Sequence, residues 1–424
     1  MKVVIMAGGR GTRMSGLFSD IPKPLVPICG RPVLEYELEC LRDQGFCDII
    51  LTVSHMADKI TEHLGDGSRL GIHIDYFIET EPLGNAGALF QLKDQLTDDF
   101  LLLNADSLFH IDFHRFVEFH KQNGGLATLF THPNDHPYDS GLIIAGEDKS
   151  VQKWLSKEDE RPKYYHNRVN AGLHIISPKL LETDKNLPKV DLDRDLLKPL
   201  AGTGKMFCYD SPEYVKDMGT PERFEAVTKD LESGKVFTRN LQNKQKAFFL
   251  DRDGTINKYK GFLTHCDDFE LLPTVSAAIK EINRSGHLAI VVTNQPVIAR
   301  GEVTYNELDE IHRKMETLLG QEGAYLDAIY YCPHHPDKGF AGEIPELKMD
   351  CNCRKPKPGM LIEAAKDFNI DLENSWMIGD RESDRVAGEA AGCRTKVIPT
   401  NGDLLEAVKE ILEDLYDGKS ESAT

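Results

Sequence analysis

The stretch Phe248-Phe249-Leu250-Asp251-Arg252-Asp253-Gly254-Thr255 decides the fold of the second half of this chain. Its apolar residues predict a buried strand, and two aspartates spaced one residue apart precede a glycine turn. Asp251 can then attack a phosphoryl group, while Asp253, on the same side, can exchange a proton with the leaving oxygen. A solvated turn after a strand has the same short pattern, so the companion segments decide between the two interpretations.

Three later segments supply matching chemistry. The run Leu288–Val292 predicts a second strand, and the hydroxyl of Thr293 at its end can donate to a phosphate oxygen. Lys355, in a basic and proline-rich stretch, can neutralise charge on a transferring phosphoryl group. A third apolar run ends at Asp380, which can complete a magnesium site with the two earlier aspartates.

In this order the four segments resemble the haloacid-dehalogenase phosphatases. The resemblance implies an α/β, Rossmann-like, three-layer fold with Asp251 as nucleophile and Asp253 as general acid and base. It also implies that Thr293 and Lys355 stabilise the phosphoryl group. Asp251, Asp253 and Asp380 would hold Mg²⁺.

A second signal lies inside this half, in Cys332-Pro333-His334-His335 and Cys351-Asn352-Cys353. Three sulfurs and an imidazole suit a tetrahedral, structural Zn²⁺, because four protein ligands leave no position for water. The expected ligands are Cys332, His334, Cys351 and Cys353, and buried thiols without a metal are the alternative. Lys355 follows closely, so the metal would fix the loop that carries it.

A zinc loop of this form resembles that of the D-glycero-D-manno-heptose 1,7-bisphosphate phosphatases and their histidinol-phosphatase relatives. The resemblance implies a phosphorylated sugar as substrate. We expect Asn294, Arg300 and Arg354 to contact it, with the two arginines holding the phosphate that is not removed. Pro296 stands where the branch usually has serine, and it removes a backbone donor from that loop.

The first half opens with the buried-strand pattern Val3–Ala7, which runs into Gly8-Gly9-Arg10-Gly11-Thr12-Arg13. Glycines let the backbone N–H groups of such a loop wrap a polyphosphate. Prolines on both sides of Lys23 fix the path of a further cation. This pair of motifs resembles the sugar-1-phosphate nucleotidyltransferases. The resemblance implies that the nucleoside triphosphate and the sugar phosphate are held by Gly8, Gly9, Gly11, Thr12, Arg13 and Lys23.

Further segments follow in that family's order. The resemblance implies that the loop Glu81–Ala88 contacts the base and the sugar through Gly84 and Asn85. Other implied contacts are Mg²⁺ on Asp106 and Asp217, a sugar hydroxyl on Asn170 and the sugar phosphate on Lys157. Such a site suits displacement at the α-phosphorus by a sugar phosphate, with pyrophosphate leaving. The attacking oxygen is already anionic, so catalysis is mostly charge neutralisation and alignment.

Length agrees with two catalytic domains, since 424 residues exceed what a single core usually holds. Strands alternate with helical stretches such as Glu35–Gly45 and Val275–Ser285, which predicts parallel sheets in both halves. We expect a nucleotidyltransferase domain at 1–232, a linker at 233–245, a phosphatase domain with its zinc loop at 246–417 and a tail at 418–424.

Composition narrows the class of partner. A formal net charge of −19 argues against nucleic acid, which requires a basic surface. No apolar run approaches the ~18 residues that span a bilayer, and no signal peptide is expected. Three of the nine cysteines are assigned to zinc and the others are scattered, which fits a reducing cytoplasm. The expected partners are small molecules, and a homo-oligomer is left open.

Together the halves predict consecutive steps, because the phosphatase product would be the transferase substrate. The first half most resembles D-glycero-α-D-manno-heptose 1-phosphate guanylyltransferases, which implies GTP and GDP-heptose, with ATP and UTP left open. One alternative is a mannose- or muramic-acid-type nucleotidyltransferase fused to a histidinol-phosphate-like phosphatase. Others are a sugar-nucleotide sensor that regulates the phosphatase, and an interaction scaffold.

Overall fold

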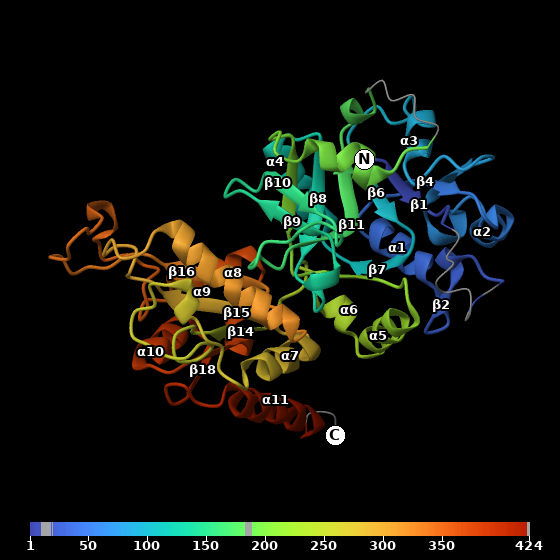
Figure 1. Ribbon diagram of the computed structural model, residues 1–424. Helices are drawn as coiled ribbons and strands as arrows, with labels where there is room; N and C mark the ends of the chain where they lie inside the picture. The colour runs from blue at the N-terminus through green and yellow to red at the C-terminus, as the bar shows by residue number, and fades with distance from the viewer. Residues whose placement is uncertain (10–17, 19, 183–188, 422–424) are drawn as a thin grey trace. The chain divides into compact units, whose positions relative to one another are not determined.

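The computed structural model describes residues 1–9, 18, 20–182 and 189–421. The chain divides into two compact units (Figure 1). The first consists of Met1–His132, Gly141–Ser156 and Val169–Asn240, and the second of Pro133–Ser140, Lys157–Arg168 and Leu241–Thr424.

Two segments of the second unit, Pro133–Ser140 and Lys157–Arg168, come from the part of the chain that was predicted to form the first domain, residues 1–232. Tyr165 shows why, since its N–H donates to the Thr317 hydroxyl at 2.9 Å and that hydroxyl donates to its carbonyl at 3.1 Å. The change between units after Asn240 falls inside the predicted linker.

The first unit is built on a nine-stranded sheet in the order β10-β9-β11-β6-β1-β4-β5, with β8 paired to β11 and β12 paired to β8. These strands are β1 (Val3–Met6), β4 (Asp48–Val53), β5 (His73–Ile78), β6 (Phe100–Asn104), β8 (Ala127–His132), β9 (Leu142–Ala145), β10 (Val151–Leu155), β11 (Val169–Ile176) and β12 (Met206–Asp210). Two small sheets pair β2 (Pro27–Ile28) with β3 (Arg31–Pro32) and β7 (Ser107–His110) with β13 (Tyr214–Asp217). The α-helices of the first unit are α1 (Val33–Arg42), α2 (Ala57–Leu64), α3 (Gly87–Gln91), α4 (Phe113–Asn123), α5 (Pro221–Glu232) and α6 (Lys235–Thr238).

This sheet is mixed, so the prediction of a parallel sheet in the first half is wrong. Strands β6, β1, β4 and β5 are parallel, but β11 runs antiparallel to β6, β8 and β9. No helix lies between β9, β10 and β11, all within the described part of the chain. Parallel neighbours need a crossover connection, and short connections instead return the chain antiparallel.

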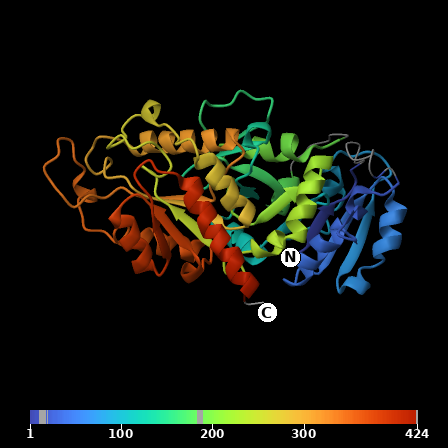
Figure 2. The ribbon, with the colours of Figure 1, turned by 90° about the horizontal axis from the view of Figure 1, so that it is seen from below.

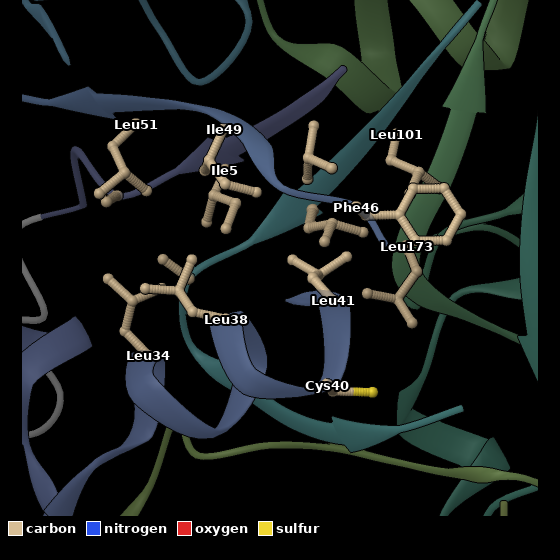
Figure 3. Close-up of a cluster of buried hydrophobic side chains, with 14 of the residues drawn as sticks. Ile5, Leu34, Leu38, Cys40, Leu41, Phe46, Ile49, Leu51, Leu101 and Leu173 are labelled. Carbon is tan, nitrogen blue, oxygen red and sulfur yellow. The ribbon is translucent and has the colours of Figure 1, made fainter. Parts of the chain in front are cut away.

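Alternate residues of β1 face opposite sides of the sheet, as strand geometry requires. Ile5 faces Leu34 and Leu38 of helix α1 (Figure 3), whereas Val4 packs on the other face of the sheet with Leu89. Each of these side chains is at most 1% exposed, and burying one contributes ~1.5–3 kcal/mol. The two faces make the first unit a three-layer structure.

The second unit has a parallel five-stranded sheet in the order β16-β15-β14-β17-β18. Its strands are β14 (Ala247–Leu250), β15 (Leu288–Asn294), β16 (Ala328–Cys332), β17 (Trp376–Gly379) and β18 (Arg394–Val397). Its helices are α7 (Val275–Ser285), α8 (Tyr305–Gln321), α9 (Gly359–Asp367), α10 (Glu382–Ala391) and α11 (Leu404–Glu421).

The opening stretch of the sequence becomes the central strand of this sheet. Phe248 and Leu250 pack against α7, α8 and α11, while Ala247 and Phe249 pack against α9 and α10. Figure 2 shows α11, in red, alongside α7 on one face. The predicted three-layer α/β fold is confirmed in this unit.

Helix α11 continues to Glu421, beyond the point at which a tail was predicted. Its apolar residues, such as Val408 and Ile411, pack on the core, and a helix nucleated there propagates readily. Among the helices that the structure describes, none has both the length and the apolar character needed to cross a membrane.

Candidate active sites

The carboxyl ends of three neighbouring strands bring predicted phosphatase residues together. Asp251 follows β14, Thr293 lies near the end of β15, and Asp380 follows β17. Strand β14 lies between the other two, and parallel strands end at one edge, where loops build a common site. Asp251, Asp380 and Asp384 each offer an oxygen, and these oxygens lie within 4.8 Å of one another.

Lys355 reaches into this carboxylate group. Its Nζ lies 2.6 Å from Asp251 Oδ1 and 2.6 Å from Asp384 Oδ1, and all three side chains are less than a tenth exposed. Burial raises the pKa of Asp251, and the ion pair with Lys355 opposes that rise. Burial would lower the pKa of Lys355, but the two carboxylates raise it above its usual range. Lys355 is therefore a fixed cation beside the predicted nucleophile.

The loop that carries Lys355 is held by Asn294. The Asn294 side chain donates to the Lys355 carbonyl at 2.9 Å and accepts from the Lys355 N–H at 3.0 Å. Asn294 was expected to contact substrate, but here its amide fastens the loop to the end of β15. Thr293 is 1% exposed, and its hydroxyl accepts a hydrogen bond from Gln295 at 2.9 Å.

Asp380 offers an oxygen suited to a cation. The Thr400 hydroxyl donates to Oδ2 at 2.6 Å, whereas Oδ1 is buried and receives no hydrogen bond from any described residue. Gly254 has a φ of +93°, and a Cβ there would lie 2.6 Å from Asp380 Oδ2. A larger residue would thus fill the space beside this carboxylate. Three close carboxylates with an orphaned oxygen fit a hard cation such as Mg²⁺.

The carboxylate of Asp253 pairs with residues other than Lys355. Arg252 Nη2 donates to its two oxygens at 3.0 and 2.9 Å, Gln295 Nε2 donates at 2.9 Å and Asn257 Nδ2 at 3.1 Å. Burial alone would raise the pKa of Asp253, but these donors lower it. Although the sequence placed Asp253 among the magnesium ligands, both of its carboxylate oxygens accept hydrogen bonds from neighbouring side chains. The carboxylate cluster around Lys355 contains Asp384 in its place.

The four predicted zinc ligands form one cluster. Cys353 Sγ lies 3.2 Å from Cys332 Sγ and 3.3 Å from Cys351 Sγ, and His334 Nδ1 lies 3.3 Å from Cys353 Sγ. Ligands about 2.0 to 2.3 Å from a tetrahedral ion lie somewhat more than 3 Å apart, so the donor set and its spacing fit Zn²⁺. Arg354 Nη1 donates to the His334 carbonyl at 3.2 Å, which ties this cluster to the loop of Lys355.

Arg300 lies between two aromatic rings. Its guanidinium carbon is 4.2 Å from the centre of the Phe262 ring and 4.3 Å from that of Phe340. It also pairs with Glu302 at 2.7 Å. These contacts fix the orientation of the guanidinium.

The first unit contains a pocket of about 620 Å³ at the carboxyl ends of its parallel strands. Of the predicted residues, Gly8, Gly9, Lys23, Gly84, Asn85 and Asp106 line it. Gly11, Thr12 and Arg13 lie outside the residues that the structure describes.

Lys23 and Asp106 meet in this pocket, with Nζ 2.5 Å from Oδ2. Asp217 lies opposite Ser107 in the pair of β13 and β7, next to Asp106 in the chain. Its carboxylate accepts from Arg223 at 2.8 Å, and burial, which would raise its pKa, is outweighed by that partner and by the Gly219 N–H. The two predicted metal aspartates are thus adjacent, and each is balanced by a cation.

The loop that carries Gly84 and Asn85 is locked in place. The Ala86 N–H donates to the Val190 carbonyl at 3.0 Å, and Asn85 accepts from the Leu192 N–H at 2.7 Å. Gly84 has a φ of +84°, and a Cβ there would lie 2.3 Å from the Val190 oxygen, so only glycine fits.

Two predicted contacts lie elsewhere. Asn170 stands at a bulge of β11, where its side chain accepts from the Gly172 N–H at 3.3 Å, and a Cβ on Gly172 would lie 2.5 Å from the Asn104 amide. Asn104 lines the pocket, whereas Lys157 is exposed and belongs to the second unit.

Sequence reasoning missed several residues of both sites, namely Arg252, Gln295 and Asp384 in the second unit and Glu79, Asn104, Lys189 and Arg223 in the first. Asp384 had a signal, because it lies four residues after Asp380, about one helical turn. The others had none, since long-range partners are not visible in sequence.

Two family models match the chain. Residues 2–234 match the nucleotidyl transferase family, and residues 352–415 match the HAD-hydrolase-like family. The first match covers more than half of the 424 residues.

Relatives of known name cover the second unit. The D-glycero-beta-D-manno-heptose-1,7-bisphosphate 7-phosphatase of Haemophilus ducreyi is 42% identical over 172 residues, which are 40% of this chain and 92% of that protein. The protein of the same name from Escherichia coli strain K12 is 42% identical over 156 residues, 37% of this chain and 80% of that protein. Among solved structures, HddC from Yersinia pseudotuberculosis has 30% identity and a TM-score of 0.47, over 54% of this chain and 99% of that one.

The fold and the two sites define a transferase joined to a phosphatase. The chain belongs to the nucleotidyl transferase family, and its second unit belongs to the phosphatase family of the Haemophilus and Escherichia proteins. The bifunctional fusion that the sequence predicted is confirmed at the level of these families.

Proposed function

We propose that this chain catalyses two consecutive steps in the formation of a nucleotide-activated heptose. The second unit removes the 7-phosphate of D-glycero-D-manno-heptose 1,7-bisphosphate. The first unit then transfers GMP from GTP to heptose 1-phosphate and releases pyrophosphate. The fusion carries this proposal, because a 7-phosphatase leaves a sugar 1-phosphate and a sugar-1-phosphate nucleotidyltransferase consumes one.

In the phosphatase step, a carboxylate oxygen of Asp251 attacks the phosphorus while the bond to the sugar oxygen breaks. Asp253, which takes up a proton from water in the second half of each turnover, gives that proton to the leaving oxygen, and the phosphoryl group is left on Asp251. Water then attacks the aspartyl phosphate, and Asp253 accepts its proton. Lys355, fixed 2.6 Å from Asp251, offsets the negative charge throughout.

Metals complete both sites in this proposal. Asp251, Asp380 and Asp384 would hold Mg²⁺ in the second unit, and Asp106 and Asp217 would hold it in the first. The ion would shield the charges of the reacting phosphates. Zn²⁺ on Cys332, His334, Cys351 and Cys353 would fix the loop that presents Arg354 and Lys355.

In the transferase step, a phosphate oxygen of heptose 1-phosphate attacks the α-phosphorus of GTP, and the bond to pyrophosphate breaks. No proton has to be removed from the attacking group. Lys23 lies where it can neutralise the phosphates, beside Asp106 and the glycine loop. Arg13 would add a second positive charge from the same loop. We place the reaction in the cytoplasm, with small-molecule substrates.

Two complementary variants test the proposal. Asp251→Asn should release no phosphate from the bisphosphate but should still form pyrophosphate from supplied heptose 1-phosphate. Asp106→Ala should release phosphate and form no pyrophosphate. Neither variant alone should convert the bisphosphate to a sugar nucleotide, and a mixture of the two should restore the conversion, because heptose 1-phosphate diffuses between them.

Loss of both activities in a folded Asp251→Asn chain would contradict the assignment of one reaction to each unit. Preferred hydrolysis of histidinol phosphate over the heptose bisphosphate would instead support the alternative fusion. Binding of sugar nucleotides without any turnover would support the sensor alternative.

A further inference from the structure

The side chain of Arg252 holds the carboxylate of Asp253 from inside the second unit. It is 0% exposed, and its Nη2 donates to both oxygens of Asp253 and to Oε1 of Gln295, over distances of 2.9 to 3.1 Å. Gln295 in turn donates to Asp253 at 2.9 Å. One guanidinium nitrogen therefore faces three acceptors, and the direction of the Asp253 carboxylate depends on where that nitrogen lies.

The other end of the guanidinium is fixed by His312 of helix α8. Arg252 Nη1 lies 3.3 Å from His312 Nε2, and His312 is 4% exposed. Burial and the Arg252 cation lower the pKa of His312 to about 3, so its ring is neutral. Because an arginine N–H only donates, Nε2 accepts and the ring proton is on Nδ1. A guanidinium is planar, so fixing Nη1 and Nη2 fixes the whole group.

Helix α8 gives His312 a rigid support. The helix begins with a capping box at Thr304, and Ile311 and Met315 pack in the core of the unit. The ring of His312 lies against that of Tyr331 on β16, with 5.6 Å between their centres. The acceptor for Arg252 is therefore carried by a packed helix, and packed elements hold a group more precisely than loops do.

A bracing contact on α8 lies at the height of His312. Asp309 and Glu316 lie three residues before and four residues after His312, on one side of the helix. His166 pairs with both, because its Nε2 lies 2.8 Å from Asp309 Oδ1 and its Nδ1 contacts Glu316 Oε2. Burial would lower the pKa of His166, but the two carboxylates raise it to about 9. The contact is therefore a pair of ionic hydrogen bonds.

His166 comes from the segment Lys157–Arg168. This segment lies in the sequence between β10 and β11, two strands of the first unit, but it folds with the second unit. The two hydrogen bonds between the Tyr165 backbone and the Thr317 hydroxyl attach it to the same helix. Chain from the transferase half of the sequence thus supports the helix that carries His312.

We propose that α8 positions the proton-transfer group of the phosphatase: His312 orients Arg252, Arg252 orients Asp253, and His166 braces the helix. This inference rests on the proposed phosphatase step and names the residues that align its acid. The three supporting residues act through Asp253 and are positioning residues. A misplacement of about 1 Å in an aligned group can cost 10²-fold in rate, so a contact behind the site has a measurable effect.

A pair of aryl phosphates tests the inference without reference to the sugar, because kcat/KM reports the step in which the leaving group departs. The 2,4-dinitrophenolate ion leaves without a proton, whereas phenol, like a sugar alcohol, needs one. For His312→Leu, kcat/KM should fall about 10- to 100-fold with phenyl phosphate and less than about threefold with 2,4-dinitrophenyl phosphate. His312→Gln keeps an acceptor oxygen and should stay within about threefold of wild type with both.

The bracing contact is tested in the same way. His166→Ala should lower the phenyl to dinitrophenyl rate ratio by about threefold or more. Asn306→Ala, at an exposed position of α8, is the matched control and should keep the wild-type ratio. The melting temperature of each variant shows whether it is folded.

Equal losses with both aryl phosphates in a folded His312→Leu chain would overturn the inference, because general damage to the unit slows both reactions alike. A wild-type rate ratio in His312→Leu or in His166→Ala would also overturn it. A natural substrate other than heptose bisphosphate would change the proposed function and leave the aryl result intact.

Nitrogen NMR of the histidine-labelled chain gives a readout that needs no turnover. The His312 signals, assigned by their loss in His312→Gln, should show a neutral ring with its proton on Nδ1 at pH 5. A protonated ring, or a proton on Nε2, would overturn the inference, because neither form can accept from Arg252 through Nε2.

Discussion

Single residues show how the phosphatase site handles charge. Lys355 lies between Asp251 and Asp384, and its partner carboxylates are almost completely buried. A buried cation is stable only where anions surround it. Lys355 therefore depends on Asp384 for its position. It also holds Asp251 through one oxygen of the Asp251 carboxylate. Sequence reasoning assigned roles to Asp251 and Lys355, but Asp384 had none until the helix that carries it was in place.

The role of Asp384 can be tested by Asp384→Asn, which keeps its shape and removes its charge. Lys355 would then pair with Asp251 alone, and the nucleophile would be held more tightly. We expect the rate of phosphate release to fall about 10- to 100-fold. Single-turnover phosphate release measures this, with Asp414→Asn on the surface of α11 as control. A rate within twofold of wild type would show that Asp384 does not act on the site.

A buried histidine predicts acid sensitivity of the first unit. His174 is 1% exposed in the core of the sheet, and burial lowers its pKa to about 4. The unfolded chain takes up this proton near pH 6.5, and the folded chain does not. The contribution to stability is therefore complete above about pH 6.5 and is lost as the pH falls toward 4.

Calorimetry should show the melting temperature of the first unit falling by several degrees between pH 7 and pH 5. His174→Leu should make that fall shallower, and His73→Gln, an exposed change on β5, should not. An equal pH dependence in wild type and His174→Leu would show that His174 does not titrate on unfolding.

At the scale of elements, the zinc cluster links β16 to the loop that ends in Lys355. Cys332 is the last residue of β16, while Cys351 and Cys353 lie just before Arg354. A metal that joins these two arms would restrict the loop without taking part in the reaction.

Cys351→Ser should reduce bound zinc from about one equivalent to almost none and slow phosphate release. Nucleotidyl transfer from supplied heptose 1-phosphate should be unchanged. Elemental analysis and both activity assays measure this, with Cys29→Ser, an exposed thiol of the first unit, as control. Less than about half an equivalent of zinc in freshly purified wild type would count against the site.

Local elements were predicted more reliably than their pairing. The predicted helix Val275–Ser285 has the same bounds in the structure. Periodicity and turn residues specify such elements locally. The antiparallel pairing of β11 with β6 was not predicted, because strand pairing depends on connections and packing that involve residues far away in the sequence.

The candidate sites divide in the same way. Residues that end a strand, such as Asp251, Asp380 and Asp106, were visible because an apolar run leads to each. Glu79, Lys189 and the fixing contact of Asn294 depend on loops that meet only in the folded chain. No local sequence pattern could indicate that these loops lie side by side.

At the scale of the whole molecule, the two activities share one intermediate. Relatives of the second unit are named for the beta anomer of heptose bisphosphate, while the first half resembles enzymes of the alpha anomer. Both units must accept one anomer for the steps to be consecutive. Each pure anomer of heptose 1,7-bisphosphate should therefore be supplied separately, since the anomer that completes both steps identifies the route.

The direct test of consecutive action is a time course on the intact chain with heptose 1,7-bisphosphate, Mg²⁺ and GTP, in which phosphate, pyrophosphate and sugar nucleotide are measured together. We expect phosphate to appear first, pyrophosphate and GDP-heptose to follow in equal amounts, and the anomeric phosphate to be retained. Release of the 1-phosphate, or phosphate release with no pyrophosphate from either anomer with any nucleoside triphosphate, would contradict it.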